Sequence, residues 1–283
     1  MVSEWQLRQD ICEIGRRLYA RGFVAGNDGN VSCRLSAERV LCTPTQICKG
    51  FMKPDDLCIV DLEGHLVAGK RHPTSEILLH LEIYRADPNT GAVVHSHPPH
   101  ATAFGVARVG IPSCVLPEVE VFLGIVPRAE YETPGGRSFA ETVRPFIGKA
   151  NTVVLSNHGT VSWGPTVEKA YWYTEILDAY CRILLLAAQI GNVERLPEAK
   201  MQELLDLKER FGVGVDPRRA VGGPLCVHTE FGRRDAPQDA APASTTGAAA
   251  EPQSLAGAAR DGQQELIQTI TERVMQALRE HQA

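Results

Sequence analysis

The sequence has few aromatic residues, no long apolar run and no strong excess of either charge. Its 283 residues include 29 basic and 34 acidic side chains, for a formal net charge of -5. A strong basic excess, the usual electrostatic basis for wrapping nucleic acid or coating an anionic membrane, is therefore absent. No segment offers about 18 uninterrupted apolar residues, the length that a membrane-spanning helix needs. These absences favour a protein that acts on small ligands, with no nucleic-acid or membrane partner.

A secretory signal is also missing from the start of the chain. The first twenty residues carry charges throughout and lack the apolar stretch of roughly 7–15 residues that a signal peptide requires. The sequence therefore predicts a cytoplasmic protein. Eight cysteines are present, but none forms a C-x-x-C pair, and the chain is longer than disulfide-stapled secreted domains. We expect reduced thiols in the core at positions 12, 33, 42, 48, 58, 114, 181 and 226.

Composition divides the chain into three parts. Apolar residues make up 43% of the sequence, enough for one sizeable core, which we expect to occupy residues 1–230. Residues 235–262 are mainly Ala, Pro, Gly, Ser, Thr and Gln and cannot bury enough apolar surface to offset their ordering entropy, so they predict a flexible linker. Apolar residues at helical spacing return in 263–283. They predict an amphipathic helix that docks on a partner, with a frayed tail or a self-associating coiled coil as alternatives.

Residue periodicity predicts helices and strands that interleave irregularly. Helical spacing of apolar residues runs from Leu7 to Leu18, and a second such pattern runs from Thr74 to Tyr84, where Ser75 is placed to cap the helix. Further elements are a long helix from residue 167 to about 189 and strands at 31–35, 39–43, 58–62, 91–97 and 152–156. Without a regular βαβ repeat, these elements favour an α/β protein with a mixed sheet covered by helices.

Two histidines on one predicted strand are the sharpest chemical feature. Side chains at positions i and i+2 of a strand project from the same face, so His95 and His97 can grip one cation. His158 follows the strand at 152–156, in a turn where the backbone freedom of Gly159 lets a side chain be placed at the sheet edge. Three neutral imidazoles with an open position are typical of catalytic zinc. Structural histidines, or a plain turn residue in the case of His158, are the alternative.

Three loops rich in glycine and small polar residues suit an anion. Residues 26–30 read Gly-Asn-Asp-Gly-Asn, and glycine conformations with positive φ let consecutive N–H groups converge there. Residues 43–45 read Thr-Pro-Thr, while Thr74 and Ser75 place hydroxyls and N–H groups at a helix start, where phosphate binds readily. Glu76 follows as a candidate for proton transfer. The alternatives are plain turns, and a carboxylate favoured only by the helix dipole.

These motifs together resemble the class II aldolase and adducin superfamily, most closely the enzymes typified by L-fuculose-1-phosphate aldolase. The resemblance covers about residues 5–212 in the family's order and approximate spacing. It implies a three-layer α/β/α fold with a central mixed, largely antiparallel sheet, assembled as a homotetramer with active sites at subunit interfaces. The matching motifs are 29–32 (Gly-Asn-Val-Ser), 43–45 (Thr-Pro-Thr), 74–76 (Thr-Ser-Glu), 95–97 (His-Ser-His) and 157–159 (Asn-His-Gly).

The resemblance also implies a role for each motif. His95, His97 and His158 become the ligands of one Zn2+ per subunit, and Glu76 becomes the acid/base that takes or returns a proton. The implied reaction is reversible retro-aldol cleavage of a ketose 1-phosphate, with L-fuculose 1-phosphate favoured, to dihydroxyacetone phosphate and a short aldehyde such as lactaldehyde. Zinc acts in it as a Lewis acid for the developing negative charge. The residues implied to hold the phosphate are Gly29, Asn30, Thr45, Thr74 and Ser75.

Three features depart from the fuculose-phosphate aldolase pattern. Gln46 stands where a glycine usually follows Thr-Pro-Thr. Segment 111–118 lacks the tyrosine that protonates the leaving aldehyde in those enzymes, and a second family tyrosine is replaced by Phe211, which has no proton to donate. Tyr131 and Glu118 are the alternatives for the missing acid.

Several functions therefore stay open at the level of sequence. Within the superfamily the alternatives are an L-ribulose-5-phosphate 4-epimerase-type enzyme and an aldolase for 5-deoxy- or 5-methylthio-ribulose 1-phosphate. A non-catalytic adducin-like oligomerisation module is the alternative from another class, against which the retention of three histidines and Glu76 argues. The C-terminal extension resembles the encapsulation peptides of bacterial microcompartments. That resemblance implies a shell protein as the partner of 263–283 and the microcompartment lumen as the location.

Overall fold

The structure is a computed structural model, and it describes residues 2–213, 216–221, 225–226, 229 and 231. All of them lie in the unit Met1–Arg234. The predicted linker 235–262 and the predicted docking helix 263–283 lie outside the described residues, so both remain predictions. In the described part of the chain, no helix combines the length and the apolar character needed to cross a membrane.

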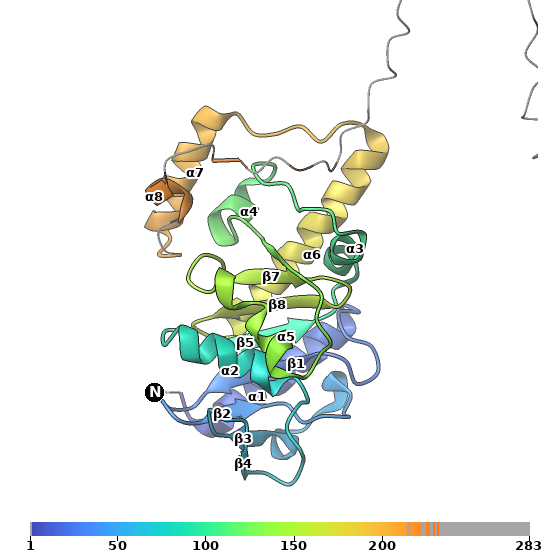
Figure 1. The fold of residues 1–283 in the computed structure, drawn as a ribbon, viewed down its shortest axis with the longest axis vertical. Helices are drawn as coiled ribbons and strands as arrows, with labels where there is room; N and C mark the ends of the chain where they lie inside the picture. The colour runs from blue at the N-terminus through green and yellow to red at the C-terminus, as the bar shows by residue number, and fades with distance from the viewer. Residues whose placement is uncertain (1, 214–215, 222–224, 227–228, 230, 232–283) are drawn as a thin grey trace, which may run out of the picture. The chain divides into compact units, whose positions relative to one another are not determined.

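An eight-stranded sheet organises the fold (Figure 1). Its strands run in the order β4-β3-β2-β1-β5-β8-β7-β6. Every neighbouring pair is antiparallel except β6 and β7, which are parallel, so the predicted mixed, largely antiparallel sheet is confirmed. The bounds are β1 Asn30–Arg34, β2 Val40–Cys42, β3 Cys58–Val60, β4 Leu66–Ala68, β5 Ala92–Ser96, β6 Arg128–Ala129, β7 Thr152–Leu155 and β8 Gly159–Gly164.

Helices lie between the strands in sequence, and three more follow the last strand (Figure 1). The α-helices are α1 Glu4–Ala20, α2 Ile77–Ala86, α3 Pro99–Ala107, α4 Pro117–Phe122, α5 Arg137–Glu141, α6 Val167–Ile190, α7 Glu198–Arg210 and α8 Arg218–Val221. Three short 3-10 helices are η1 Lys49–Phe51, η2 Pro54–Asp56 and η3 Arg144–Phe146. The long helices α1 and α6 match the helices that residue periodicity predicts over residues 7–18 and 167–189.

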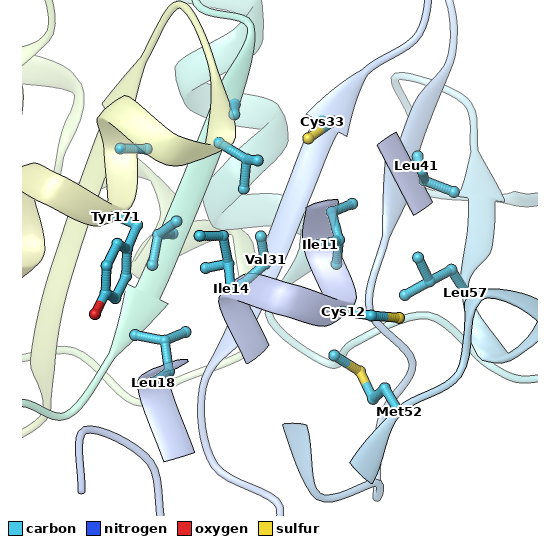
Figure 2. Close-up of a cluster of buried hydrophobic side chains, with 14 of the residues drawn as sticks. Ile11, Cys12, Ile14, Leu18, Val31, Cys33, Leu41, Met52, Leu57 and Tyr171 are labelled. Carbon is cyan, nitrogen blue, oxygen red and sulfur yellow. The ribbon is translucent and has the colours of Figure 1, made fainter. Parts of the chain in front are cut away.

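Both faces of the sheet are covered, which confirms the predicted three-layer architecture. On one face α1 and α6 bury a cluster that includes Ile11 of α1 and Val31 and Cys33 of β1 (Figure 2). On the other face α2 and α5 pack against the sheet, with Phe139 of α5 among the buried side chains. Because successive side chains of a strand point to opposite faces, β1 sends Val31 and Cys33 to the first layer and Ser32 to the second. The helix α2 therefore faces the polar side of β1.

The start of α2 differs from the prediction. The helix begins at Ile77 rather than at Thr74, and its N-cap is Glu76, so Ser75 does not cap it. The Thr74 carbonyl accepts a hydrogen bond from the Ile77 N–H, and Thr74 Oγ1 accepts one from the Glu76 N–H at 3.4 Å. A threonine-stabilised turn therefore precedes the helix. The Glu76 side chain makes no capping bond and is available for other contacts.

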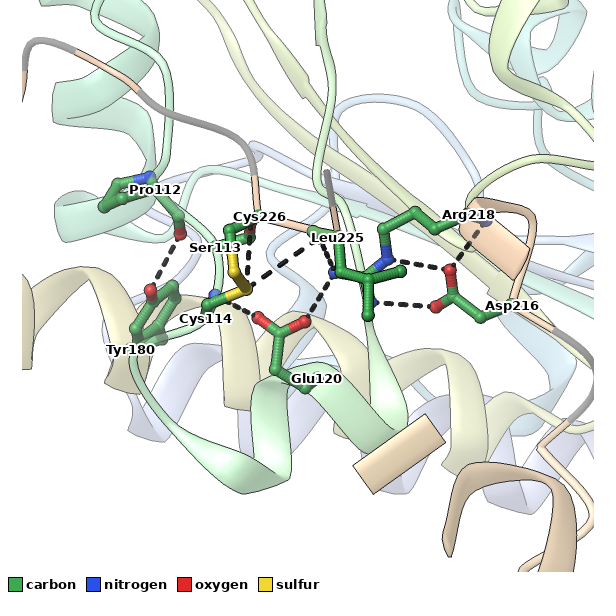
Figure 3. The surroundings of a disulfide bond; sticks show 9 residues. All are labelled: Pro112, Ser113, Cys114, Glu120, Tyr180, Asp216, Arg218, Leu225 and Cys226. Carbon is green, nitrogen blue, oxygen red and sulfur yellow. Dashed lines mark hydrogen bonds and ion pairs between the residues drawn. A yellow bond between two sulfur atoms is a disulfide. The ribbon is translucent and has the colours of Figure 1, made fainter. Parts of the chain in front are cut away.

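Two cysteines contradict the expectation of reduced thiols. Cys114 and Cys226 form a disulfide across 112 positions of sequence (Figure 3). The bond ties the segment that follows α8 to the loop that precedes α4. The lack of C-x-x-C pairs excludes only local bonds, and it says nothing of two cysteines that the fold brings together. The remaining six cysteines are free, and all of them except Cys48 are buried.

Candidate active site

The motifs found in the sequence meet at one edge of the sheet. β1 starts there and its neighbours β5 and β2 end there, since Asn30 pairs with His95 and the last residue of β2 pairs with Ser32. β8 starts at the same edge, where Thr160 pairs with Ser96. The antiparallel order thus carries the ends of four strands, far apart in sequence, to one line of loops.

Three histidines converge at this edge. His95 lies in β5, His97 follows the end of that strand, and His158 lies in the turn between β7 and β8. The Nε2 of His95 lies 3.2 Å from the Nε2 of His97 and 3.1 Å from the Nε2 of His158. One ligand atom from each ring falls within 4.8 Å of the other two. The structure therefore brings the three predicted ligands together.

Contacts on the far sides of the rings orient these nitrogens. Nδ1 of the fully buried His95 lies 2.8 Å from the Thr160 carbonyl oxygen, which can only accept, so Nδ1 carries the proton. His97 Nδ1 likewise faces an Asp28 carboxylate oxygen at 3.5 Å. A neutral ring protonated at Nδ1 presents the lone pair of Nε2 to the cluster, which is how outer-shell contacts prepare a histidine to bind metal.

The donor set fits a tetrahedral metal ion. Zinc–nitrogen bonds of about 2.0–2.1 Å at tetrahedral angles place neighbouring nitrogens about 3.3 Å apart, close to the 3.1 and 3.2 Å found between the rings. Lone pairs directed at one point repel one another unless a cation lies between them. Burial and the neighbouring imidazoles lower the pKa of His97 to about 3, which keeps that ring neutral. Burial also lowers the pKa of His95, but the adjacent Glu76 carboxylate outweighs it and the net shift is upward.

Glu76 lies directly beside the histidine cluster. Its Oε2 is 3.2 Å from His95 Nε2, and its Oε1 is 3.2 Å from His158 Nε2. The Asn30 side-chain N–H donates to Oε2 at 2.8 Å. Burial alone would raise the pKa of Glu76, but His95, His158 and Asn30 together hold it well below its usual range. An ionised carboxylate in this place can exchange a proton with a substrate bound next to the imidazoles.

The turn that carries His158 uses its glycine in an unexpected way. The sequence predicts that Gly159 supplies backbone freedom, but Asn157 is the residue in the left-handed conformation, with a φ of 54°. Gly159 is needed for space instead. A Cβ at this position would lie 2.5 Å from His97 Cδ2 and 2.5 Å from the Ser96 carbonyl oxygen. The missing side chain thus lets β8 approach the His97 ring.

The loops predicted to hold phosphate adjoin one another and the histidines. An antiparallel bridge joins loop 43–45 to loop 72–74, and the Thr74 N–H donates to the Thr43 carbonyl. Thr43 Oγ1 accepts from the Val31 N–H at the start of β1. The residues that the resemblance assigns to phosphate therefore lie in or next to three loops that adjoin in space: Gly29, Asn30, Thr45, Thr74 and Ser75.

These five residues differ in how accessible they are to a ligand. Ser75 is exposed and Thr45 is partly exposed, whereas Thr74 is buried. Gly29 adopts a φ of 68°, and a Cβ there would lie 2.5 Å from Val24 Cγ1. Gln46 also adopts a left-handed conformation, with a φ of 57°, at the position where the related aldolases usually have glycine. The loop keeps its glycine-like backbone despite the larger residue.

Asn30 is committed to partners other than a ligand. Its side-chain N–H donates to Glu76, and its Oδ1 lies 2.6 Å from His80 Nε2. The residue is 3% exposed. Since the oxygen and one N–H of the amide are engaged, only the second N–H is left for a phosphate.

Lys49 adds a charge that no motif in the sequence marks. Its side chain is 1% exposed, and Nζ donates to the carbonyls of Asn27 and Ile47, each at 2.7 Å. Burial lowers the pKa of Lys49 to about 8. The ammonium joins loop 26–30 to the segment after Thr45 and places positive charge near the predicted anion site. A lysine in a polar turn is usually solvated, so its sequence context gives no hint of this burial.

The two alternatives for the missing acid lie at the surface. Tyr131, in the loop between β6 and α5, is 51% exposed, and Glu118, in the first turn of α4, is also exposed. Phe211, which replaces the second family tyrosine, is exposed at the end of α7. All three are open to a ligand or a second copy of the chain, and the identity of the acid stays a prediction.

Comparison with known sequences identifies one family. The class II aldolase and adducin N-terminal domain matches residues 9–185. An L-fuculose phosphate aldolase of Methanococcus vannielii is 37% identical over 175 residues, which cover 62% of this chain and 93% of that protein. A 3-oxo-tetronate 4-phosphate decarboxylase of Cupriavidus necator is 33% identical over 213 residues, which cover 73% of this chain and 97% of that protein.

Comparison with solved structures agrees with the sequence comparison. An L-fuculose 1-phosphate aldolase superposes with a TM-score of 0.67 and 27% identity, covering 75% of this chain and 98% of its own. YgbL of Klebsiella pneumoniae, described as an aldolase, epimerase or decarboxylase, has a TM-score of 0.67 and 30% identity, covering 72% of this chain and 100% of its own. The similarity extends over nearly the whole of each relative.

Proposed function

The chain belongs to the class II aldolase and adducin family, and we propose on that basis that it is a metal-dependent lyase that cleaves a carbon–carbon bond of a sugar phosphate. The observation that carries the proposal is the convergence of three histidine Nε2 atoms beside the buried carboxylate of Glu76. His95, His97 and His158 would hold one Zn2+ per subunit. That ion would supply a Lewis acid for the negative charge that develops on the substrate.

The favoured substrate is L-fuculose 1-phosphate, which the aldolases among the relatives are named for. Cleavage breaks the bond between C3 and C4, Glu76 accepts the proton of the C4 hydroxyl, and lactaldehyde leaves. The electron pair of the broken bond stays with the C1–C3 fragment as an enediolate. Glu76 returns the proton to C3 and dihydroxyacetone phosphate is released. The adjoining loops would hold the C1 phosphate through Gly29, Asn30, Thr45, Thr74 and Ser75.

Decarboxylation of 3-oxo-tetronate 4-phosphate is the second candidate. The decarboxylase relative is 33% identical and covers more of this chain than the aldolase of Methanococcus vannielii does. Loss of carbon dioxide from this 3-oxo acid leaves the same three-carbon enediolate, again protonated on carbon. Decarboxylation releases no aldehyde, so this reaction needs no tyrosine in segment 111–118, where the chain has none. The two candidates thus share Glu76 and the metal and differ in the leaving group.

The deciding experiment pairs metal analysis with product detection. Purified protein is assayed for aldehyde release on a panel of ketose 1-phosphates and for carbon dioxide release from 3-oxo-tetronate 4-phosphate. We expect H97A to lose metal and activity together and E76Q to lose activity while it keeps the metal. His65, with a side chain 78% exposed, provides the matched control H65A, which should keep both. Activity that survives chelation and both site substitutions would rule out the proposed mechanism.

Two related functions are distinguished by their products. An epimerase would convert L-ribulose 5-phosphate to its epimer with no net release of aldehyde, because the two fragments are rejoined. A 5-deoxy- or 5-methylthio-ribulose 1-phosphate aldolase would release a different aldehyde from the same panel. An adducin-like module would bind no metal and turn over none of these compounds.

We further propose a cytoplasmic homotetramer whose enzyme domain occupies residues 1–230, with 263–283 as an address for a microcompartment shell. A shell would retain a reactive aldehyde until a later enzyme consumes it. The support is the amphipathic spacing in 263–283 after a segment poor in apolar residues. Deletion of 263–283 should leave turnover unchanged and abolish co-purification with shell proteins. Equal recovery of the shortened chain with the shell would refute the address.

A further inference from the structure

A buried row of polar side chains joins strand β1 to helix α2. We define the β1–α2 ladder as Asn30 and Ser32 of the strand with Glu76, the N-cap of the helix, and His80 and Tyr84 within it. Residues two apart on a strand share a face, and so do residues four apart on a helix. Two strand residues span about 6.6 Å and four helix residues about 6.0 Å, so the two rows stay matched over their length. The spacing explains why both elements carry polar residues at these intervals.

Every member of the ladder lies within hydrogen-bonding distance of the next. Asn30 Nδ2 is 2.8 Å from Glu76 Oε2, and Asn30 Oδ1 is 2.6 Å from His80 Nε2. His80 Nδ1 is 2.7 Å from Ser32 Oγ, which is 2.9 Å from the Tyr84 hydroxyl. His80 and Ser32 are fully buried, and Tyr84 is 1% exposed. These groups must therefore satisfy one another, because an unpaired polar group in the core is costly.

The contact between Asn30 and Glu76 fixes the direction of every bond in the ladder. The Asn30 side-chain N–H donates to Glu76 Oε2, so the amide turns its oxygen toward His80. His80 Nε2 must then donate. Burial lowers the pKa of His80 to about 3, so the ring is neutral and its Nδ1 accepts from Ser32. Ser32 Oγ in turn accepts from the Tyr84 hydroxyl.

We propose that His80 is a positioning residue for the acid/base: its Nε2–H holds the Asn30 amide in the one orientation that donates to Glu76 and so fixes the carboxylate beside the histidine cluster. The inference rests on the proposed function for the role of Glu76. Without the His80 donor, only Glu76 holds the amide, and the buried Asn30 oxygen is left without a partner. An amide that turns or shifts to satisfy this oxygen loses its N–H bond to Glu76 and no longer fixes the carboxylate.

The substitutions H80L and H80Q test this role in the metal-loaded enzyme. Leucine removes the donor, whereas a glutamine amide can donate from a place near that of Nε2. We expect H80L to lower kcat about 10- to 100-fold, the usual effect of losing an outer-shell partner, with KM and metal content little changed. H80Q should recover a large part of that loss. The same order should appear in deuterium exchange at C3 of dihydroxyacetone phosphate, which isolates the proton transfer of Glu76 from bond cleavage.

Equal losses of kcat in H80L and H80Q, or losses that track metal content, would overturn the proposal. A second measurement needs no variant. In protein labelled with 15N-histidine, long-range 1H–15N spectra should show His80 neutral and protonated at Nε2, the opposite tautomer to His95. A charged His80, or one protonated at Nδ1, would also overturn it. Failure of the proposed function would look different, because the unmodified enzyme itself would show neither cleavage nor exchange.

Discussion

Gly159 leaves no room for even one added carbon, and the atoms that would be displaced belong to the metal site. A G159A substitution places Cβ 2.5 Å from His97 Cδ2 and from the Ser96 carbonyl oxygen, and backbone cannot move aside cheaply. We expect the His97 ring to shift and metal affinity to fall about 10- to 100-fold. Gly191 provides the control, because nothing lies within 4 Å of a Cβ there. Metal titration should show G191A binding like the unmodified protein, and equal affinities in all three would contradict the packing argument.

Lys49 is expected to act on phosphate recognition through its charge and its two carbonyl contacts. K49M should raise KM for the phosphorylated substrate about tenfold, since a charged hydrogen bond contributes roughly 1.5–3 kcal/mol, and should change kcat less. Because the pKa of Lys49 is lowered to about 8, the ammonium is lost as pH rises through that value. KM of the unmodified enzyme should therefore rise above about pH 8, while KM of K49M stays flat there.

The exposed Lys70 supplies the control for that measurement. K70M removes one positive charge from the surface without touching the loops, so its KM should follow the unmodified enzyme at every pH. Identical pH profiles of KM for K49M and the unmodified enzyme would show that Lys49 plays no part in binding the phosphate.

At the level of residues, the sequence predicts which side chains form the site better than it predicts which side chains they contact. The residue types and spacings mark four candidate side chains, and the fold does bring them together: His95, His97, His158 and Glu76. Asn30 is assigned by resemblance to phosphate, yet its amide contacts Glu76 and His80. The ladder is visible afterwards as N-x-S on the strand and E-x-x-x-H-x-x-x-Y on the helix. Only the pairing of those two elements gives that pattern a meaning.

Among the elements, α3 depends on a residue from elsewhere in the chain. The helix starts at Pro99 with no cap of its own, and Asp178 of α6 accepts from the N–H groups of His100 and Ala101 at 2.8 and 3.1 Å. Asp178 also contacts His100 Nδ1 at 2.8 Å. Removing a capping carboxylate costs about 0.5–2 kcal/mol, so D178A should lower the free energy of unfolding by that amount.

Urea unfolding of the metal-free protein measures this effect without interference from the site. Glu175, one turn earlier on α6, pairs with Arg21 across a partly exposed contact, and E175Q should change stability by less than about 1 kcal/mol. A D178A variant as stable as E175Q would mean that the helix start needs no cap from α6.

Element boundaries show where local sequence reasoning fails. Apolar periodicity places the long helices and the order of strands well, because burial on one face dictates it. The predicted start of α2 is wrong, because Ser75 would cap a helix well if only its local sequence mattered. Contacts of Glu76 with Asn30, His95 and His158 hold that residue at the helix start instead, and those contacts join elements far apart in sequence.

For the molecule as a whole, the α/β architecture with its mixed sheet follows from the order of the elements and the lack of a βαβ repeat. The disulfide does not follow, because Cys114 and Cys226 are 112 positions apart and only the completed fold makes them neighbours. The same applies to the buried ion pairs around it, where Arg218 contacts both Glu120 and Asp216 (Figure 3). Such contacts join the segment after α7 to α4.

The disulfide and these ion pairs should both raise the free energy of unfolding of the described unit. A covalent loop of this length restricts the unfolded chain, and removing a disulfide of this kind typically costs about 2–4 kcal/mol. C226S should lower the free energy of unfolding by that amount. Adding a reductant should then cause no further loss of stability in this variant. C48S, at a free and partly buried thiol, is the matched control and should stay sensitive. If C226S unfolds like the unmodified protein in both redox conditions, the ion pairs of Arg218 alone hold this segment in place.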